Sequence, residues 1–211
     1  MDKEQFWNIV NEVHSSTDPR NQKEVLAALR NRLRNLLSEE ILEWKQVFSF
    51  YQDAARRNDL WAASAAMGAH SSDDGFMDFR SWLISQGHDV YMSALEDPES
   101  LVSVDTDGQE LNFEDYAYVP CKAYAERRTY EEMSVGDILA SYIKWAAANE
   151  QQKQNDLAAG ERGMPQKSTD FFVQSAMLGK YDLYDEMERR ELPDDILRRL
   201  KEDIPQRGDI A

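Results

Sequence analysis

Apolar side chains recur at helical spacing along most of the chain. In residues 20–37, Val25, Leu29, Leu33 and Leu36 fall three or four positions apart, which is typical of a helix that buries one face. Polar, Gly-containing or Pro-containing breaks separate similar stretches. The resulting predicted helices are residues 3–14, 20–37, 38–55, 60–67, 76–86, 88–95, 113–131 and 134–149, followed by a helix that begins at Pro193. The pattern therefore predicts an all-α fold.

One segment between the predicted helices departs from this spacing. Residues 101–104 and 110–113 are short apolar-containing runs that flank Asp107 and Gly108. An Asp-Gly pair between two such runs is typical of a tight β-turn. We therefore expect one short β-hairpin over about residues 101–113, within an otherwise helical protein.

The distribution of large apolar residues indicates how the chain is divided. Residues 1–133 carry enough of them for a single globular helical core domain. Residues 150–168 carry almost none and contain Gly and Pro, which indicates a polar loop. We therefore predict a core domain over 1–133 and a helical C-terminal extension over 134–211, with a polar loop near 150–168.

The charge balance limits the classes of partner. The chain has 40 acidic and 24 basic residues, a formal net charge of -16. Such a chain is repelled by nucleic acid and by anionic membranes, so we expect neither as a partner. Cys121 is the single cysteine, and neither a signal peptide nor a membrane-length apolar run is present. We expect a soluble cytoplasmic protein.

Residues 70–87 contain the densest group of candidate site residues. Ser72, Asp73 and Asp74 precede a predicted helix that also carries Arg80. In one interpretation they cap this helix, and Arg80 pairs with one of the acids. In the other they line a polar pocket, with the acids as ligands or as a general base, Arg80 holding an anion and Trp61 as an apolar wall. Both interpretations remain open.

A second candidate surface lies in the acidic stretch between Glu96 and Cys121, which contains neither Lys nor Arg. Tyr116 and Tyr118 occur among its carboxylates. A charge run of this kind is either a solvated face or a docking face for a basic partner, with the tyrosines as buried anchors. In the second case the partner would be a basic protein, such as a toxin or a regulatory target.

The residues that bind metals and common cofactors do not form recognisable motifs. His14, His70 and His88 are scattered, and with one cysteine they do not have the spacing of a zinc site. Phosphate-binding and dinucleotide-binding Gly-rich motifs are missing, as is the Gly-x-Ser-x-Gly motif of hydrolases. We expect no metal and no cofactor, and the sequence identifies no catalytic residues.

Several short motifs together resemble one protein family. They are Leu60-Trp61-Ala62-Ala63, Ser72-Asp73-Asp74-Gly75-Phe76, Phe79-Arg80-x-Trp82-Leu83-Ile84 with Gly87, Asp97-Pro98 and Ala123-Tyr124. Over about residues 1–133 the chain resembles an uncharacterised bacterial family, domain of unknown function 4240. The resemblance implies a shared fold and transfers no reaction.

Two functions follow from these candidates. The first is a non-enzymatic acidic protein-interaction module, for example an immunity or regulatory factor that binds a basic surface through the stretch containing Tyr116 and Tyr118. The alternative is a small-molecule-binding or hydrolytic domain that uses a polar pocket around Asp73, Asp74 and Arg80, with Ser72 and Trp61 beside them.

Overall fold

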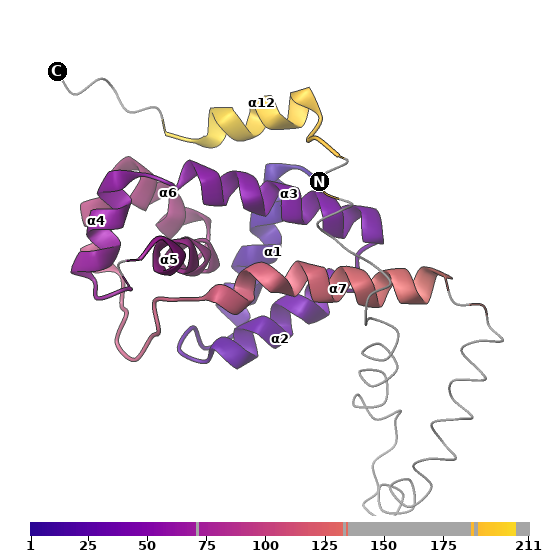
Figure 1. The fold of residues 1–211 in the computed structure, drawn as a ribbon, viewed down its shortest axis with the longest axis horizontal. Helices are drawn as coiled ribbons and strands as arrows, with labels where there is room; N and C mark the ends of the chain where they lie inside the picture. Colours follow the sequence, from indigo (N-terminus) through magenta and orange to yellow (C-terminus); the bar gives the residue numbers. More distant parts are fainter. Residues whose placement is uncertain (71, 133, 135–186, 188–189, 206–211) are drawn as a thin grey trace, which may run out of the picture. The chain divides into compact units, whose positions relative to one another are not determined.

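The protein folds into α-helices joined by short turns, as a computed structural model shows for residues 1–70, 72–132, 134, 187 and 190–205 (Figure 1). The helices in these residues are α1 (Lys3–Ser16), α2 (Gln22–Leu33), α3 (Ser38–Ala54), α4 (Asn58–Ala66), α5 (Asp73–Ser85), α6 (His88–Glu96), the 3-10 helix η1 (Pro98–Ser103), α7 (Glu114–Glu132) and α12 (Asp194–Asp203). The part of the chain that the structure describes contains no strand, so the predicted all-α fold is confirmed.

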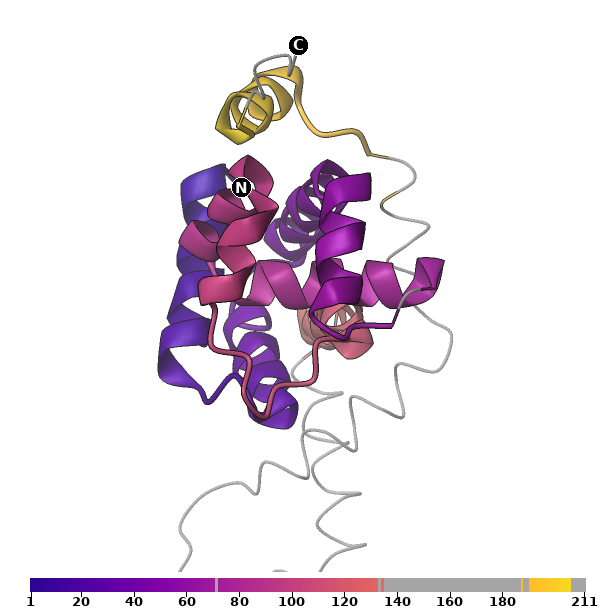
Figure 2. The ribbon, with the colours of Figure 1, turned by 90° about the vertical axis from the view of Figure 1, so that its left-hand side faces the viewer.

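Helix α5 is central to the packing. It contacts α1, α3, α4 and α6, and it is seen end-on in Figure 1 and runs across the centre of Figure 2. Nine of its thirteen residues are buried, so it lacks the single solvent-exposed face of an ordinary surface helix. Phe76, Phe79, Trp82 and Leu83 are among the buried side chains. The stretch singled out in the sequence is therefore the helix around which the others pack.

Aromatic side chains fill the space between α1 and α3. Phe6 lies 5.0 Å from Trp44 and 5.2 Å from Tyr51, measured between ring centroids, and Trp44 stacks on Phe48 at 5.5 Å. All four of these side chains are fully buried. Their three- and four-residue spacing in the sequence had placed them on single helix faces, and the structure packs those faces against each other.

The predicted β-hairpin over residues 101–113 is wrong, because neither of its strands is formed in this segment. Residues 98–103 form the 3-10 helix η1, with Pro98 in its first turn and the Asp97 carboxylate accepting a hydrogen bond from the Glu99 amide. Pro is well suited to the first turn of a helix and Asp to its cap. These two residues start a helical turn immediately before Leu101, whose buried side chain holds that turn against the core.

The turn in this segment is present without the paired strands. Gly108 has a φ of +71°, in the left-handed region where glycine is favoured. The residues after it are held by side chains, because Gln22 Nε2 donates to the carbonyl oxygens of Glu110 and Asn112, each at 3.1 Å. Two carbonyl groups that a second strand would offer to its neighbour therefore bond to α2, and the Phe113 amide donates to the Asp78 carbonyl oxygen of α5.

The chain divides into two compact units, residues 1–124 with 183–211 and residues 125–182. In the first unit, α12 is attached by the buried Leu200 and by Asp203. In the second, the described end of α7 carries ion pairs four residues apart, Arg127 with Glu131 and Arg128 with Glu132. The boundary near residue 133 stays a prediction, and the helix over 134–149 and the loop over 150–168 lie outside the described residues.

Within the described residues, every helix is too short or too polar to cross a lipid bilayer.

Candidate functional site

A cleft of about 560 Å³ opens where α3 ends, α4 begins and α5 makes its first turns. We call it the α3–α4–α5 cleft. Its lining is formed by Gln52, Asp53, Arg56, Arg57, Asn58, Trp61, Asp73, Asp74, Phe76, Met77 and Arg80. This volume lies within the range of small-molecule sites, and the lining combines three arginines and three aspartates with an aromatic wall.

Arg80 projects from α5 to the C-terminal end of α3. Its Nη1 donates to the Gln52 carbonyl oxygen at 2.7 Å, and its Nε lies 3.4 Å from the Phe76 carbonyl oxygen. Its guanidinium lies 5.2 Å from the centre of the Phe76 ring. The last carbonyls of a helix have no partner within that helix and carry partial negative charge, so a cation at this position stabilises the end of α3.

The positive charge of Arg80 is nonetheless enclosed without a counter-ion. The residue is 8% exposed, and among the described residues no carboxylate lies within ion-pair distance of it. Burial lowers the pKa of its guanidinium; the nearby charge of Asp53 acts in the opposite direction, and that of Arg56 lowers the pKa further. The predicted pairing of Arg80 with Asp73 or Asp74 is therefore not formed.

One nitrogen of Arg80 makes no hydrogen bond to the described residues. Nη2 takes part in none of its hydrogen bonds to the described residues, and it is not one of the fully enclosed polar atoms that lack a partner. It therefore keeps access to the cleft that Arg80 lines. Arg56, on the same cleft wall, is exposed and forms no ion pair with a described residue.

The acids at the start of α5 remain available because a neighbour performs the capping. Ser72 is the N-cap, and its hydroxyl accepts a hydrogen bond from the Gly75 amide at 3.0 Å. Asp73 and Asp74 are exposed and line the cleft, and neither bonds to another described residue through its side chain. Ser72 therefore caps the helix, as the first interpretation predicts. Asp73, Asp74, Arg80 and Trp61 instead line one cleft, as the second interpretation predicts.

Gly75 and Asn112 set the position of the turn before α5. The Asn112 side chain donates to the Gly75 carbonyl oxygen at 2.9 Å and accepts from the His70 amide at 3.2 Å. A Cβ atom at Gly75 would lie 2.5 Å from the His70 carbonyl oxygen. Only glycine permits this close approach, which carries Asp73 and Asp74 to the cleft.

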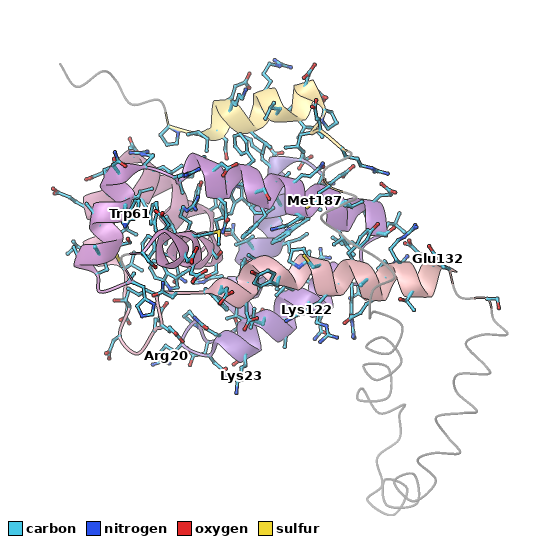
Figure 3. The ribbon with its side chains drawn as sticks, in the orientation of Figure 1. Arg20, Lys23, Trp61, Lys122, Glu132 and Met187 are labelled. Carbon is cyan, nitrogen blue, oxygen red and sulfur yellow. The ribbon has the colours of Figure 1, made fainter. Side chains whose placement is uncertain are left out.

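An aromatic pair forms the apolar wall. Trp61 of α4 stacks on Phe76 of α5 with ring centroids 5.2 Å apart and planes 8° apart. Trp61 is half-buried, and Figure 3 shows it on α4. Met77 is exposed beside them. The cleft therefore offers a flat apolar surface between its charged groups.

The arginines and polar residues at the α3–α4 junction were missed by sequence reasoning. Arg56, Arg57 and Asn58 fall in one of the polar breaks between the predicted helices, residues 38–55 and 60–67. The arginine pair at that break was the available signal, but the sequence does not show that the junction faces α5. Arg57 itself is committed to the fold, because it binds Asp59 at 2.7 Å and the Leu95 carbonyl oxygen at 2.6 Å.

The acidic stretch keeps its charge but loses one of its expected anchors. Asp105, Asp107, Glu110, Glu114 and Asp115 are all exposed. Tyr118 is 39% exposed.

Tyr116 is 1% exposed, because its ring packs in the core 5.2 Å from Phe113 and 5.9 Å from Phe48, between ring centroids. Tyr116 is therefore not accessible to a partner, which corrects its predicted role. Helical spacing placed it one turn from exposed positions and did not show which face α7 turns to the core.

In the described part of the chain, no three His, Cys, Asp or Glu side chains converge as metal ligands.

Fold and site together define an all-α protein with a charged, aromatic-walled cleft beside its central helix. A family model described as "Protein of unknown function (DUF4240)" matches residues 1–126. The chain belongs to this family, which confirms the resemblance seen in the sequence. Searches of curated proteins and of solved structures found no match.

Proposed function

We propose that the protein binds a small molecule with an anionic group in the α3–α4–α5 cleft. One observation carries this proposal: the guanidinium of Arg80 is enclosed, faces the cleft, and has no carboxylate partner among the described residues. Structural arginines that are this deeply buried are ordinarily paired. Here the counter-charge would come from the ligand.

The energetics support a ligand anion at this position. Removing an ion from water costs several kcal/mol even after the surroundings relax. The end of α3 offsets part of this cost, since a helix C-terminus carries only about half of an elementary negative charge. A carboxylate or phosphate at Nη2 would bring a full charge, and the exposed Arg56 would add a second contact.

The lining favours binding over a chemical reaction. The described residues around the cleft include no histidine, cysteine or serine, and so no nucleophile activated by a neighbouring base. Arginines, aspartates and a tryptophan supply charge complementarity and a stacking surface. We therefore propose a binding module and assign no catalytic residue.

The test is a titration with small anions followed by two-dimensional NMR. Inorganic phosphate, acetate and succinate are added to the full chain, and the indole N–H signal of Trp61 is followed after assignment with Trp61→Phe. We expect saturable shifts of this signal and of the Arg80 side chain. Shifts that stay linear at every anion, or that are spread over the whole surface, contradict the proposal.

Arg56→Gln tests the same site without disturbing a buried contact. Because Arg56 is exposed, its loss should weaken anion binding by about two- to fivefold, the range of an exposed ion pair. Lys23→Gln is the matched control, since Lys23 is exposed on α2 and lies away from Trp61 (Figure 3). Equal weakening by both substitutions would indicate general electrostatics and would reject the cleft as the site.

A second candidate is the protein-interaction module expected from the acidic stretch. The exposed carboxylates of residues 105–115, together with the exposed Tyr118 and Val102, support this proposal. It would make the protein an immunity or regulatory factor that covers a basic partner in the cytoplasm. A basic partner captured by the wild type should be released by salt and lost with Tyr118→Ala, and capture insensitive to both would reject it.

A further inference from the structure

Helix α5 presents opposite charges along one side of the cleft. Asp73, Phe76, Met77 and Arg80 all line it, at the three-, four- and seven-residue spacings that place side chains on the same helix face. The acids lie in the first turn and Arg80 lies in the third. The α5 side of the cleft therefore has an acidic end, an apolar middle and a basic end.

The distance between the two charged ends follows from helix geometry. Positions 73 and 80 are separated by about 10 Å of helical rise. The Arg80 side chain folds back toward the helix start, as its Nε contact with the Phe76 carbonyl oxygen shows. The Phe76 carbonyl oxygen points toward the C-terminal end of α5, so the guanidinium lies between the levels of Phe76 and Arg80, which is about 5–10 Å of helical rise beyond Asp73.

The two ends do not neutralise each other. Among the described residues, Asp73 and Asp74 form no ion pair, and Arg80 is held by backbone carbonyls. The Phe76 ring, stacked on Trp61, occupies the middle of the cleft. A ligand that complements this order carries a cation, then an apolar stretch, then an anion.

We propose that the cleft takes a linear zwitterion whose ammonium and carboxylate groups are about 5–10 Å apart. This rests on the proposed anion site at Arg80 and adds the cation that the ligand must carry. An α-amino acid is too short, since its charged groups are separated by two bonds and about 2.5 Å. One added residue extends a chain by up to about 3.5 Å. Dipeptides and ω-amino acids therefore share the required chemistry.

The experiment is a chain-length series measured by calorimetry with the full-length protein. The probes are glycine, γ-aminobutyrate, ω-aminohexanoate and glycylglycine, with hexanoate and hexylamine as singly charged controls. We expect ω-aminohexanoate and glycylglycine to bind about tenfold more tightly than glycine and hexanoate. Tighter binding of glycylglycine identifies peptides as the source, and tighter binding of ω-aminohexanoate identifies linear amino acids.

The variant Asp73→Asn with Asp74→Asn separates the two proposals. It should abolish the preference for ω-aminohexanoate over hexanoate, because the ammonium group loses its carboxylate partners while Arg80 is retained. Hexanoate and ω-aminohexanoate binding equally to the wild type would overturn the zwitterion while the anion site stands. Failure of every anionic probe would overturn both.

Discussion

Two enclosed charges in the first compact unit, Asp203 and Arg80, are treated differently by the fold. The Asp203 side chain is 11% exposed and accepts hydrogen bonds from Lys3 Nζ at 2.7 Å and from the Tyr51 hydroxyl at 2.9 Å. His88 Nε2 lies 3.9 Å from the same carboxylate. Arg80 donates only to carbonyl oxygens and has no carboxylate partner among the described residues. The charge of Asp203 is therefore neutralised by a described residue, whereas that of Arg80 is not.

This difference separates the structural role of Asp203 from the binding role proposed for Arg80. A buried ion pair with its remaining hydrogen bonds satisfied is part of the architecture, and breaking it by removing one partner is strongly destabilising. A buried ion without a counter-ion raises the free energy of the folded protein until something binds it. Asp203 therefore attaches α12 to the core, whereas the absence of a carboxylate partner for Arg80 among the described residues is the basis of the proposed ligand site.

The largest effect is expected from Asp203→Ala. It removes the acceptor of Lys3 and leaves the hydroxyl of Tyr51, which is fully buried, without a partner. We expect a loss of about 2–3 kcal/mol in the free energy of unfolding, measured by urea denaturation. Asp195→Ala in the same helix is the control, because Asp195 is exposed. A similar small loss in both variants would show that α12 is not held by Asp203.

Gly75→Ala should lower the free energy of unfolding by about 2 kcal/mol, somewhat less than Asp203→Ala. The added Cβ would lie 2.5 Å from the carbonyl oxygen and the Cβ of His70, so the turn before α5 must move. The same movement should weaken ligand binding at the Asp73 end of the cleft. Gly68→Ala is the comparison, because a Cβ added at Gly68 would meet no atom within 4 Å. Gly68 has a φ of +90°, so the substitution lowers stability only through backbone strain. Unchanged stability in Gly75→Ala would contradict the observed approach of His70.

Arg80→Met tests the comparison between Arg80 and Asp203 directly. We expect it to lower the free energy of unfolding by about 1 kcal/mol. Methionine keeps an apolar side chain against Phe76. The substitution removes the hydrogen bonds to carbonyl oxygens, which lowers stability, but it also removes the cost of burying an unpaired cation, which offsets part of that loss. Anion binding should disappear. The measurement is urea denaturation alongside the Asp203→Ala variant. A loss as large as that of Asp203→Ala would mean that the fold itself satisfies the Arg80 charge.

The pH dependence of stability should report the Asp203 side of the comparison. Asp203 raises the pKa of Lys3, and burial together with Asp203 raises the pKa of Tyr51 well above its usual value. Both groups are protonated in the folded state at pH values where the unfolded chain has begun to lose protons. Their stabilisation is therefore complete below about pH 10 and declines above it. Urea midpoints between pH 9 and 11 should fall less steeply in Tyr51→Phe, and an unchanged slope would contradict this assignment.

The sequence predicted the helices and much of the cleft because local patterns determine both. Apolar spacing identified the buried faces of α1 to α5, and the Ser72 cap and the charges of Asp73 and Arg80 followed from residue types at a helix start. The β-hairpin prediction failed although its Asp-Gly turn is present. Asp97 and Pro98 start a helical turn over residues 98–103, which occupies much of the segment expected to form the first strand.

The remaining features depend on which helices meet. Nothing in the residues of the α3–α4 junction shows that Arg56 faces α5, and nothing near Asp203 indicates a partner at Lys3. Tyr116 was misplaced for the same reason, since an aromatic residue among acids fits either face of a helix until the neighbours are known. Long-range packing, rather than local propensity, decides each of these cases.

The contact between Lys3 and Asp203 joins residues that are 200 positions apart in the chain. During synthesis the first five helices leave the ribosome well before α12 has been made. Closing so long a loop is slow relative to forming neighbouring helix contacts, so this contact should be the last to form. Until α12 has been made, Tyr51 and Lys3 lack their acceptor, so this part of the fold is completed only after its synthesis.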